Sequence, residues 1–204
     1  MESRSPQRLV HSSISIKAWS AQTPSVDAVR PATCPVCDAA GHPVGDGVVL
    51  HGHGLRERQI RGVRLPLDPP ALLVIFARRY ACQRCGAVLL VVPAAVGARR
   101  LFDLATIAFA LARWCADGVA SRAVRAQVSP LHVVGDSARR TWSQLRRWAR
   151  RAAEILRPPR RGIEPDASVA TTRAVLDAVA AQAPLSLAAR PLAERAFAAM
   201  ATAR

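Results

Sequence analysis

The sequence predicts an α+β protein in which a small antiparallel sheet precedes a helical region. Short runs rich in Val, Ile and Leu, separated by turn residues, occupy much of residues 48–92. Beyond Pro93 the apolar residues recur at helical spacing. Two Cys-x-x-Cys pairs flank most of the strand-like runs. We therefore expect four segments, namely a flexible N-terminal arm (1–32), a metal-binding ribbon (33–98), a helical region (99–157) and a linker with an Ala-rich tail (158–204).

The first 32 residues are expected to form a loosely ordered arm. They are rich in Ser, interrupted by Pro and without a sustained hydrophobic period. Charged residues such as Arg4, Arg8 and Lys17 leave no apolar core for a secretory signal. The longest apolar runs, 86–98 and 104–112, fall short of the roughly 20 residues that a bilayer requires. The expected location is the cytoplasm, without membrane association.

The ribbon segment has the features of a small antiparallel sheet. Its turns are marked by Gly-His-Gly at 52–54, by Gly62 and by Asp68-Pro69-Pro70. A sheet of this size buries little apolar surface, so a bound metal would substitute for a larger core. The expected strands are 48–51, 59–67, 72–81 and 88–92.

The two cysteine pairs, Cys34-Pro-Val-Cys37 and Cys82-Gln-Arg-Cys85, predict one tetrahedral zinc site. Gly86 suits the turn after the second pair because it tolerates positive φ. The 44 residues between the pairs exceed the usual spacing, but loop-closure entropy grows only slowly with length. Disulfides or a redox pair are the alternatives. A reducing cytosol and the lack of a βαβ pattern favour the metal.

The remaining metal-binding residue types are given structural roles. His51 and His53 alternate on an expected strand, and His42 lies near the first pair. Because four cysteines already complete a tetrahedron, we expect the histidines to be structural or to face phosphate. Cys115 lies in an apolar helical stretch and is expected to be a small buried residue.

The helical region is expected to contain three helices. Apolar spacing predicts the first at 101–116 and the second at 121–128, which Ser121 caps. The third begins after Asp136 or Ser137 and ends before Pro158-Pro159. Together they suggest a helix-turn-helix, although the link at 129–136 is longer than in the compact motif.

The third expected helix separates apolar and cationic residues onto opposite faces. Trp142, Leu145, Trp148, Ala149 and Ile155 fall on one side at about 100° per residue. Arginine offers a planar fork of donors that matches phosphate oxygens, so the other face is a candidate DNA contact. That face carries Arg139, Arg140, Arg146, Arg147, Arg150 and Arg151.

The charge balance points to a polyanionic partner. The formal net charge is +15, and residues 99–161 hold fourteen of the basic residues against four acidic ones. A one-signed basic segment favours nucleic acid. DNA is the expected partner, and RNA and a homodimer remain open. The alternative role for this face is a solvated surface. The alternative function for the protein is a protein–protein adapter that uses the zinc ribbon and the Trp-bearing helix.

Residues 34 to about 156 resemble a known arrangement. The two cysteine pairs, a His-Gly followed by an Arg-rich stretch (56–64), and Arg78-Arg79-Tyr80-Ala-Cys82 carry the resemblance. They resemble the zinc-binding head of bacterial insertion-sequence transposases, and equally a bacterial family in which this head precedes a helix-turn-helix. The resemblance implies zinc at Cys34, Cys37, Cys82 and Cys85, and DNA held by head and helices.

The chain departs from a full transposase in its C-terminal part. Those enzymes continue into a large domain in which three carboxylates hold Mg²⁺. Here only Glu164, Asp166, Asp177 and Glu194 follow the third helix. We therefore expect no enzymatic activity and assign no catalytic residue. A truncated or accessory transposase, or a regulator, is the expected role. The alternative is a fragment that acts with a separate catalytic chain.

Residues 162–204 carry four basic and four acidic residues and are rich in Ala. The stretches 172–182 and 191–203 could form helices with little besides Ala to bury, or be partly disordered. A tail with no net positive charge is not expected to contact nucleic acid.

Overall fold

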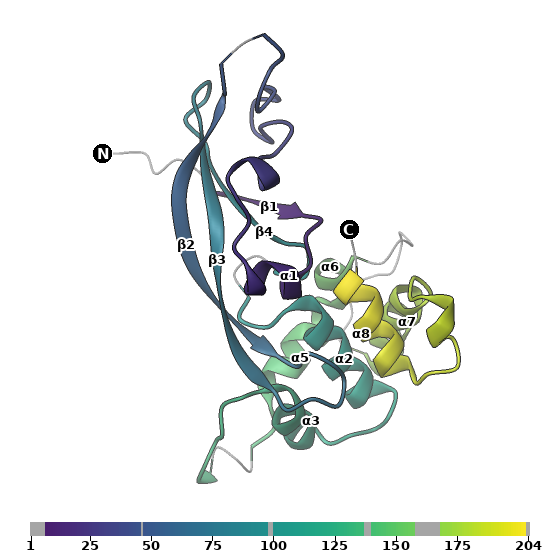
Figure 1. The fold of residues 1–204 in the computed structure, drawn as a ribbon. Helices are drawn as coiled ribbons and strands as arrows, with labels where there is room; N and C mark the ends of the chain where they lie inside the picture. Colours follow the sequence, from purple (N-terminus) through teal and green to yellow (C-terminus); the bar gives the residue numbers. More distant parts are fainter. Residues whose placement is uncertain (1–6, 46, 98–99, 137–139, 158–167, 203–204) are drawn as a thin grey trace. The chain divides into compact units, whose positions relative to one another are not determined.

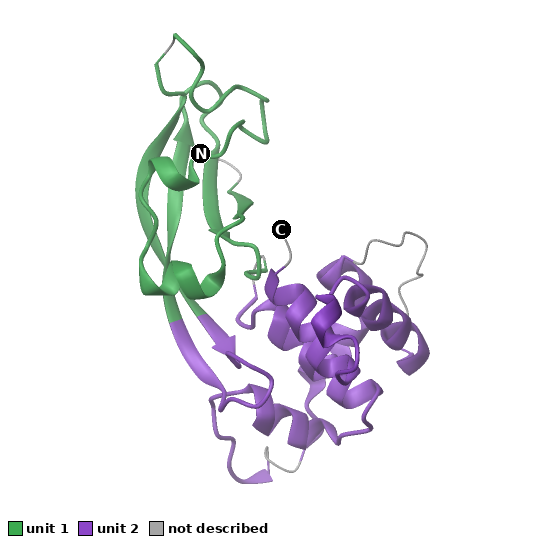
Figure 2. Cartoon of the chain, turned by 45° about the vertical axis from the view of Figure 1, so that its right-hand side comes forward, with its two compact units in different colours: residues 1–59, 74–98, 204 green, residues 60–73, 99–203 purple. Residues whose placement is uncertain are grey.

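The computed structural model describes residues 7–45, 47–97, 100–136, 140–157 and 168–202. The protein has the expected mixture of sheet and helix, with a four-stranded sheet and a set of helices (Figure 1). It divides into two compact units (Figure 2). Unit 1 comprises residues 1–59, 74–98 and 204, and unit 2 comprises 60–73 and 99–203. The boundary falls within β2 (Leu50–Gly62) and β3 (Ala71–Cys82).

The sheet has the strand order β1-β4-β3-β2. Strand β3 pairs with β4 (Val88–Pro93) in antiparallel register, with Tyr80 opposite Leu89. On its other side β4 pairs in parallel with β1 (Arg8–Ser12). The sheet is therefore mixed and not wholly antiparallel as expected.

The N-terminal residues differ from the expected flexible arm. They supply β1, the short helix α1 (Ile16–Ala21) and the 3-10 turn η1 (Asp27–Val29). Ser15 caps α1 by accepting a hydrogen bond from the Ala18 N–H. Leu9 and Val10 pair with β4, and Trp19 and Val29 are buried.

Three side chains tie this N-terminal segment to β3. The indole of Trp19 is buried, and its Nε1–H donates to the Phe76 carbonyl at 3.0 Å. The Tyr80 hydroxyl donates to the Val26 carbonyl, and Arg78 donates to the Pro24 carbonyl. Burial of Tyr80 raises the pKa of its phenol, which keeps the hydroxyl protonated as a donor.

Unit 2 is built around α2 (Leu104–Cys115), whose residues Ala105–Ala112 are all buried. The other helices of the unit pack against α2 or against one another. They are α3 (Ser121–Val128), α5 (Ser143–Arg150), α6 (Ala152–Leu156), α7 (Val169–Ala180) and α8 (Leu192–Thr202), with the 3-10 turn η2 (Leu185–Leu187) between the last two. None of the described helices is long and apolar enough to cross a membrane.

The Ala-rich C-terminal segment is helical and forms part of this core. Helices α7 and α8 bury Val175, Leu176 and Met200. Phe197 of α8 meets Phe109 of α2 edge to face, with ring centroids 6.3 Å apart. The apolar residues among the alanines are thus enough to dock both helices. Small Ala side chains let the backbones approach closely.

The third expected helix is shorter and interrupted. It begins at Ser143, and Arg151 separates α5 from α6. Aromatic packing sets the start, because Trp142 lies edge to face with Phe102 and Trp148 at centroid distances of 5.9 and 5.1 Å. The Trp142 N–H donates to Ser121 Oγ at 3.3 Å. The expected N-terminal turn at 137–139 lies outside the described residues.

The start of α2 is fixed by a buried polar cluster. Asp103 caps the helix by accepting from the Thr106 N–H at 2.6 Å and from its hydroxyl at 2.9 Å. Thr106 Oγ1 in turn accepts from the Val63 N–H at 3.2 Å. A side chain at Gly62 would collide with Thr106, so glycine is required where β2 ends. Burial raises the pKa of Asp103 to about 6.

Candidate functional site: a four-cysteine centre and an arginine face

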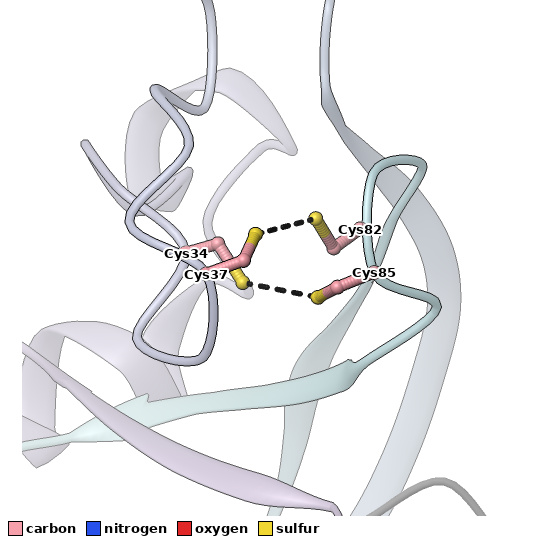
Figure 3. A group of neighbouring side chains, drawn as sticks. All are labelled: Cys34, Cys37, Cys82 and Cys85. Carbon is pink, nitrogen blue, oxygen red and sulfur yellow. Dashed lines mark hydrogen bonds between the residues drawn. The ribbon is translucent and has the colours of Figure 1, made fainter.

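Four cysteine sulfurs converge at one end of the sheet in unit 1 (Figure 3). Cys34 and Cys37 come from the loop before β2, whereas Cys82 ends β3 and Cys85 lies in the turn to β4. The Sγ atoms of Cys34 and Cys85 are 3.8 Å apart, as are those of Cys37 and Cys82. All four sulfurs lie within 4.8 Å of one another. The residues are therefore positioned to hold a metal ion.

The first cysteine loop is closed by two backbone hydrogen bonds. The Cys34 N–H donates to the Ala39 carbonyl at 2.8 Å, and the Asp38 N–H donates to the Cys34 carbonyl at 2.9 Å. Asp38 adopts φ of 54°. Aspartate tolerates this left-handed conformation better than most residues do.

The second loop repeats the same pattern. The Cys82 N–H donates to the Ala87 carbonyl and the Gly86 N–H to the Cys82 carbonyl, both at 2.9 Å. Gly86 adopts φ of 71°, which confirms the expected role of this glycine. The two loops therefore share the pattern Cys-x-x-Cys-(Asp/Gly)-Ala. The Ala at the sixth position is a signal that the sequence analysis missed.

The spacing of the sulfurs matches a tetrahedral ion. A metal–sulfur bond of about 2.3 Å implies a sulfur–sulfur edge of about 3.8 Å. Two of the sulfur–sulfur distances between the two loops have this value, and all four sulfurs lie within 4.8 Å of one another. Four thiolates suit zinc and also other thiophilic ions such as iron. The geometry therefore indicates where a metal would bind but does not identify the metal.

The electrostatics of the centre favour a thiolate at Cys82. Burial alone would raise the pKa of this thiol, but hydrogen bonds from the backbone of Cys85 and Arg84 and from neighbouring thiols outweigh burial and lower it to about 7. The thiolate is the form that ligates metal.

The other candidate ligands stay apart from the centre. Among the described residues, no other group of His, Cys, Asp and Glu brings three ligand atoms together. His42, His51 and His53 are all exposed. Cys115 is half-buried and not fully buried as expected, and burial raises the pKa of its thiol to about 11.

Helix α5 of unit 2 has the expected two faces. Leu145, Trp148 and Ala149 are buried. Arg146 and Arg147 are exposed, as is Arg150 one turn further on. No ion pair joins these three arginines to any residue that the structure describes. We call Arg146, Arg147 and Arg150 the arginine face.

The other three arginines of the expected DNA contact differ from this set. Arg140 is exposed but precedes α5, and Arg139 lies outside the described residues. Arg151 donates two hydrogen bonds to Glu154, at 2.7 and 2.5 Å. This hydrogen-bonded pairing lowers the pKa of Glu154 and raises that of Arg151. The Arg151 guanidinium is thus already hydrogen-bonded to a carboxylate.

Arg100 is a further cation that helical periodicity did not indicate. It precedes α2 in the chain, and its pKa is lowered first by burial and then by the charge of Arg151. Its charge also helps to lower the pKa of Glu154, so the three groups are close in space. The sequence around Arg100 does not indicate that it lies near Arg151 and Glu154, because this proximity arises only in the folded structure.

Comparison of the chain with protein-family models, with curated proteins and with solved structures found no match.

Proposed function

We propose that this chain is a non-enzymatic, zinc-dependent DNA-binding protein related to transposases, either a truncated or accessory transposase or a regulator. The observation that supports it most is the arginine face. Three exposed guanidiniums lie on one side of a helix whose other side is held by the aromatic contacts of Phe102, Trp142 and Trp148.

The arrangement of the arginine face favours an anionic partner. Arg146 and Arg150 are four residues apart, and Arg147 and Arg150 are three apart, so their like charges repel across the helix surface. Bound phosphates would relieve that repulsion and would match the forked donors of guanidinium. The duplex backbone presents such phosphates in a regular row.

The zinc would have a structural role in unit 1. It would cross-link the two cysteine loops, which lie 44 residues apart in sequence. Four cysteine ligands are a common ligand set of structural zinc, and metal analysis of the purified protein distinguishes zinc from iron. One zinc per chain is expected. Stoichiometric iron, or no metal, would contradict this part of the proposal.

Salt dependence tests the DNA contact. We expect log affinity for a 30-base-pair duplex, measured by fluorescence anisotropy, to fall linearly with log salt. Replacing Arg146, Arg147 and Arg150 with Gln should flatten the slope by about 0.9 for each phosphate that the variant no longer neutralises.

A matched control removes three charges from elsewhere in unit 2. Arg64, Arg173 and Arg190 are exposed, and the last two already pair with Asp177 and Glu194. Their replacement with Gln should leave the slope near that of the unaltered protein. Equal slopes for both triple variants would contradict the assignment of the interface. No duplex binding at low salt would contradict the proposed function and favour a protein adapter.

A further inference from the structure

The loop that follows α3 carries an apolar tip. Leu131 is 50% exposed, Val133 36% and Val134 83%. Gly135 turns the chain directly afterwards with φ of 66°. In Figures 1 and 2 this loop projects away from the helices of unit 2. We call Leu131, Val133 and Val134 the apolar tip.

The base of this loop is cationic on both limbs. The hydrogen bond from the Trp142 N–H to Ser121 Oγ, 3.3 Å long, brings the starts of α3 and α5 together. Exposed Arg122 lies in the first turn of α3, and exposed Arg140 lies on the returning limb. Arg146 follows in the first turn of α5. The apolar tip is thus preceded and followed along the chain by exposed guanidiniums.

Single exposed apolar residues are common on protein surfaces and need no partner. Three within four residues are a different pattern. They lie in a loop that Arg122 and Arg140 flank along the chain and that carries one exposed carboxylate, Asp136. On a nucleic acid, arginines hold the phosphates at the groove edges while an apolar side chain reaches between the bases. Both kinds of group are present here on one short loop and its base.

We propose that the apolar tip inserts between stacked base pairs of duplex DNA and kinks the duplex. This inference rests on the proposed DNA-binding function and adds to it a mode of contact. Insertion of an apolar wedge unstacks a base step and bends the duplex by about 20 to 90°. The contact would favour easily unstacked pyrimidine–purine steps, which gives sequence preference without hydrogen bonds to base edges.

A membrane surface is the competing partner for a basic, apolar loop. Segments that lie in lipid headgroups are amphipathic helices with Lys or Arg on one face and Trp, Phe or Leu on the other. Leu131, Val133 and Val134 lie in the loop after α3 and not on the apolar face of a helix. The backbone conformation of the tip therefore favours insertion into DNA.

The test replaces Val133 and Val134 together with Ser in the full chain. A 30-base-pair duplex with dyes at both ends and 2-aminopurine at a central TA step is the probe. The unaltered protein should shorten the end-to-end distance and raise the 2-aminopurine fluorescence. The double variant should lose both signals, with affinity reduced about tenfold or less, because phosphate contacts supply most of it.

The matched control is Val44→Ser, which changes a fully exposed valine in a loop of unit 1 and should leave both signals intact. Retention of the bend by the double variant would overturn the proposal. So would binding of the unaltered protein without any bend. A third outcome is that the duplex stays unbent while the protein binds vesicles of phosphatidylserine and phosphatidylcholine and the double variant does not. This outcome would contradict the proposal and show that the tip binds membranes. Failure to bind any duplex would overturn the proposed function as well.

Discussion

The two units are stabilised in different ways. Unit 2 surrounds one buried helix with apolar residues from the helices around it, and Ile107 and Leu111 at its centre have no exposed surface. Unit 1 holds a four-stranded sheet whose cysteine end is closed by backbone hydrogen bonds and by the four sulfurs. Unit 1 also buries apolar side chains such as Trp19, Tyr80 and Leu89, so we expect a metal at the cysteine end to add to a hydrophobic core and not to replace one. The units should therefore respond differently to the same perturbations.

Loss of the metal is expected to have the largest effect. Cys82→Ser should abolish metal binding and expose the amides of both cysteine loops, because structural zinc sites supply about 10 kcal/mol or more to small domains. Helix α2 should stay protected. Hydrogen exchange measured by mass spectrometry distinguishes the two regions.

Cys115→Ser is the control for this change. Cys115 is the fifth cysteine, belongs to unit 2 and is not part of the four-cysteine group, so its replacement should leave the metal content unchanged. If the cysteine loops of the Cys82→Ser protein exchanged as slowly as those of the unaltered protein, unit 1 would not depend on the metal.

A cavity in unit 2 should produce the reverse pattern. Leu111→Ala removes a fully buried side chain of α2 and should lower the free energy of unfolding of unit 2 by about 2–5 kcal/mol. The metal content of unit 1 should not change. Leu185→Ala, at a residue that is 92% exposed, should alter stability by less than about 0.5 kcal/mol. Parallel loss of metal in the Leu111 variant would show that the units fold together.

Acid should stabilise unit 2 through Asp103. Its pKa is raised from 3.8 to about 6 by burial, so the folded protein binds this proton more tightly than the unfolded chain. The contribution of Asp103 to stability therefore increases as the pH falls from about 6 to about 4, and it is lost as the pH rises again. The full effect is about 2–3 kcal/mol.

The Asp103→Asn variant isolates the contribution of Asp103 to the pH dependence of stability from that of the other carboxyl groups. The amide oxygen can still accept the Thr106 N–H and cap α2, but it carries no titrating group. The difference in unfolding free energy between the two proteins, measured from pH 4 to 7, should follow a single titration. A difference that does not vary with pH would contradict the raised pKa.

Local patterns predicted the features that depend on few residues. Each cysteine loop is set by its own turn, so Cys34, Cys37, Cys82 and Cys85 could be grouped from spacing alone. The separation of Leu145 and Trp148 from the arginine face follows from helical periodicity. The DNA contact itself, like the zinc, remains a prediction.

Features that depend on long-range contacts could not be predicted. β1 exists because it pairs with β4, which lies far along the chain, as in the register of Arg8 with Leu89. The start of α5 depends on Phe102, which is distant in sequence from Trp142. The docking of α7 and α8 depends on partners in α2, which no local period in an Ala-rich stretch reveals.

The smallest expected change in stability concerns a position at which the two cysteine loops differ in residue type. Each needs a left-handed residue at the fifth position, which is Asp38 in one and Gly86 in the other. A side chain at Gly86 would meet no atom within 4 Å, so only the backbone conformation opposes one. Gly86→Ala should therefore cost unit 1 about 1–2 kcal/mol, and Gly86→Asp should cost less, because Asp visits this conformation more readily. Thermal unfolding of unit 1 with metal in excess measures both variants. An alanine variant as stable as the unaltered protein would show that the conformation at Gly86 is not what the loop requires.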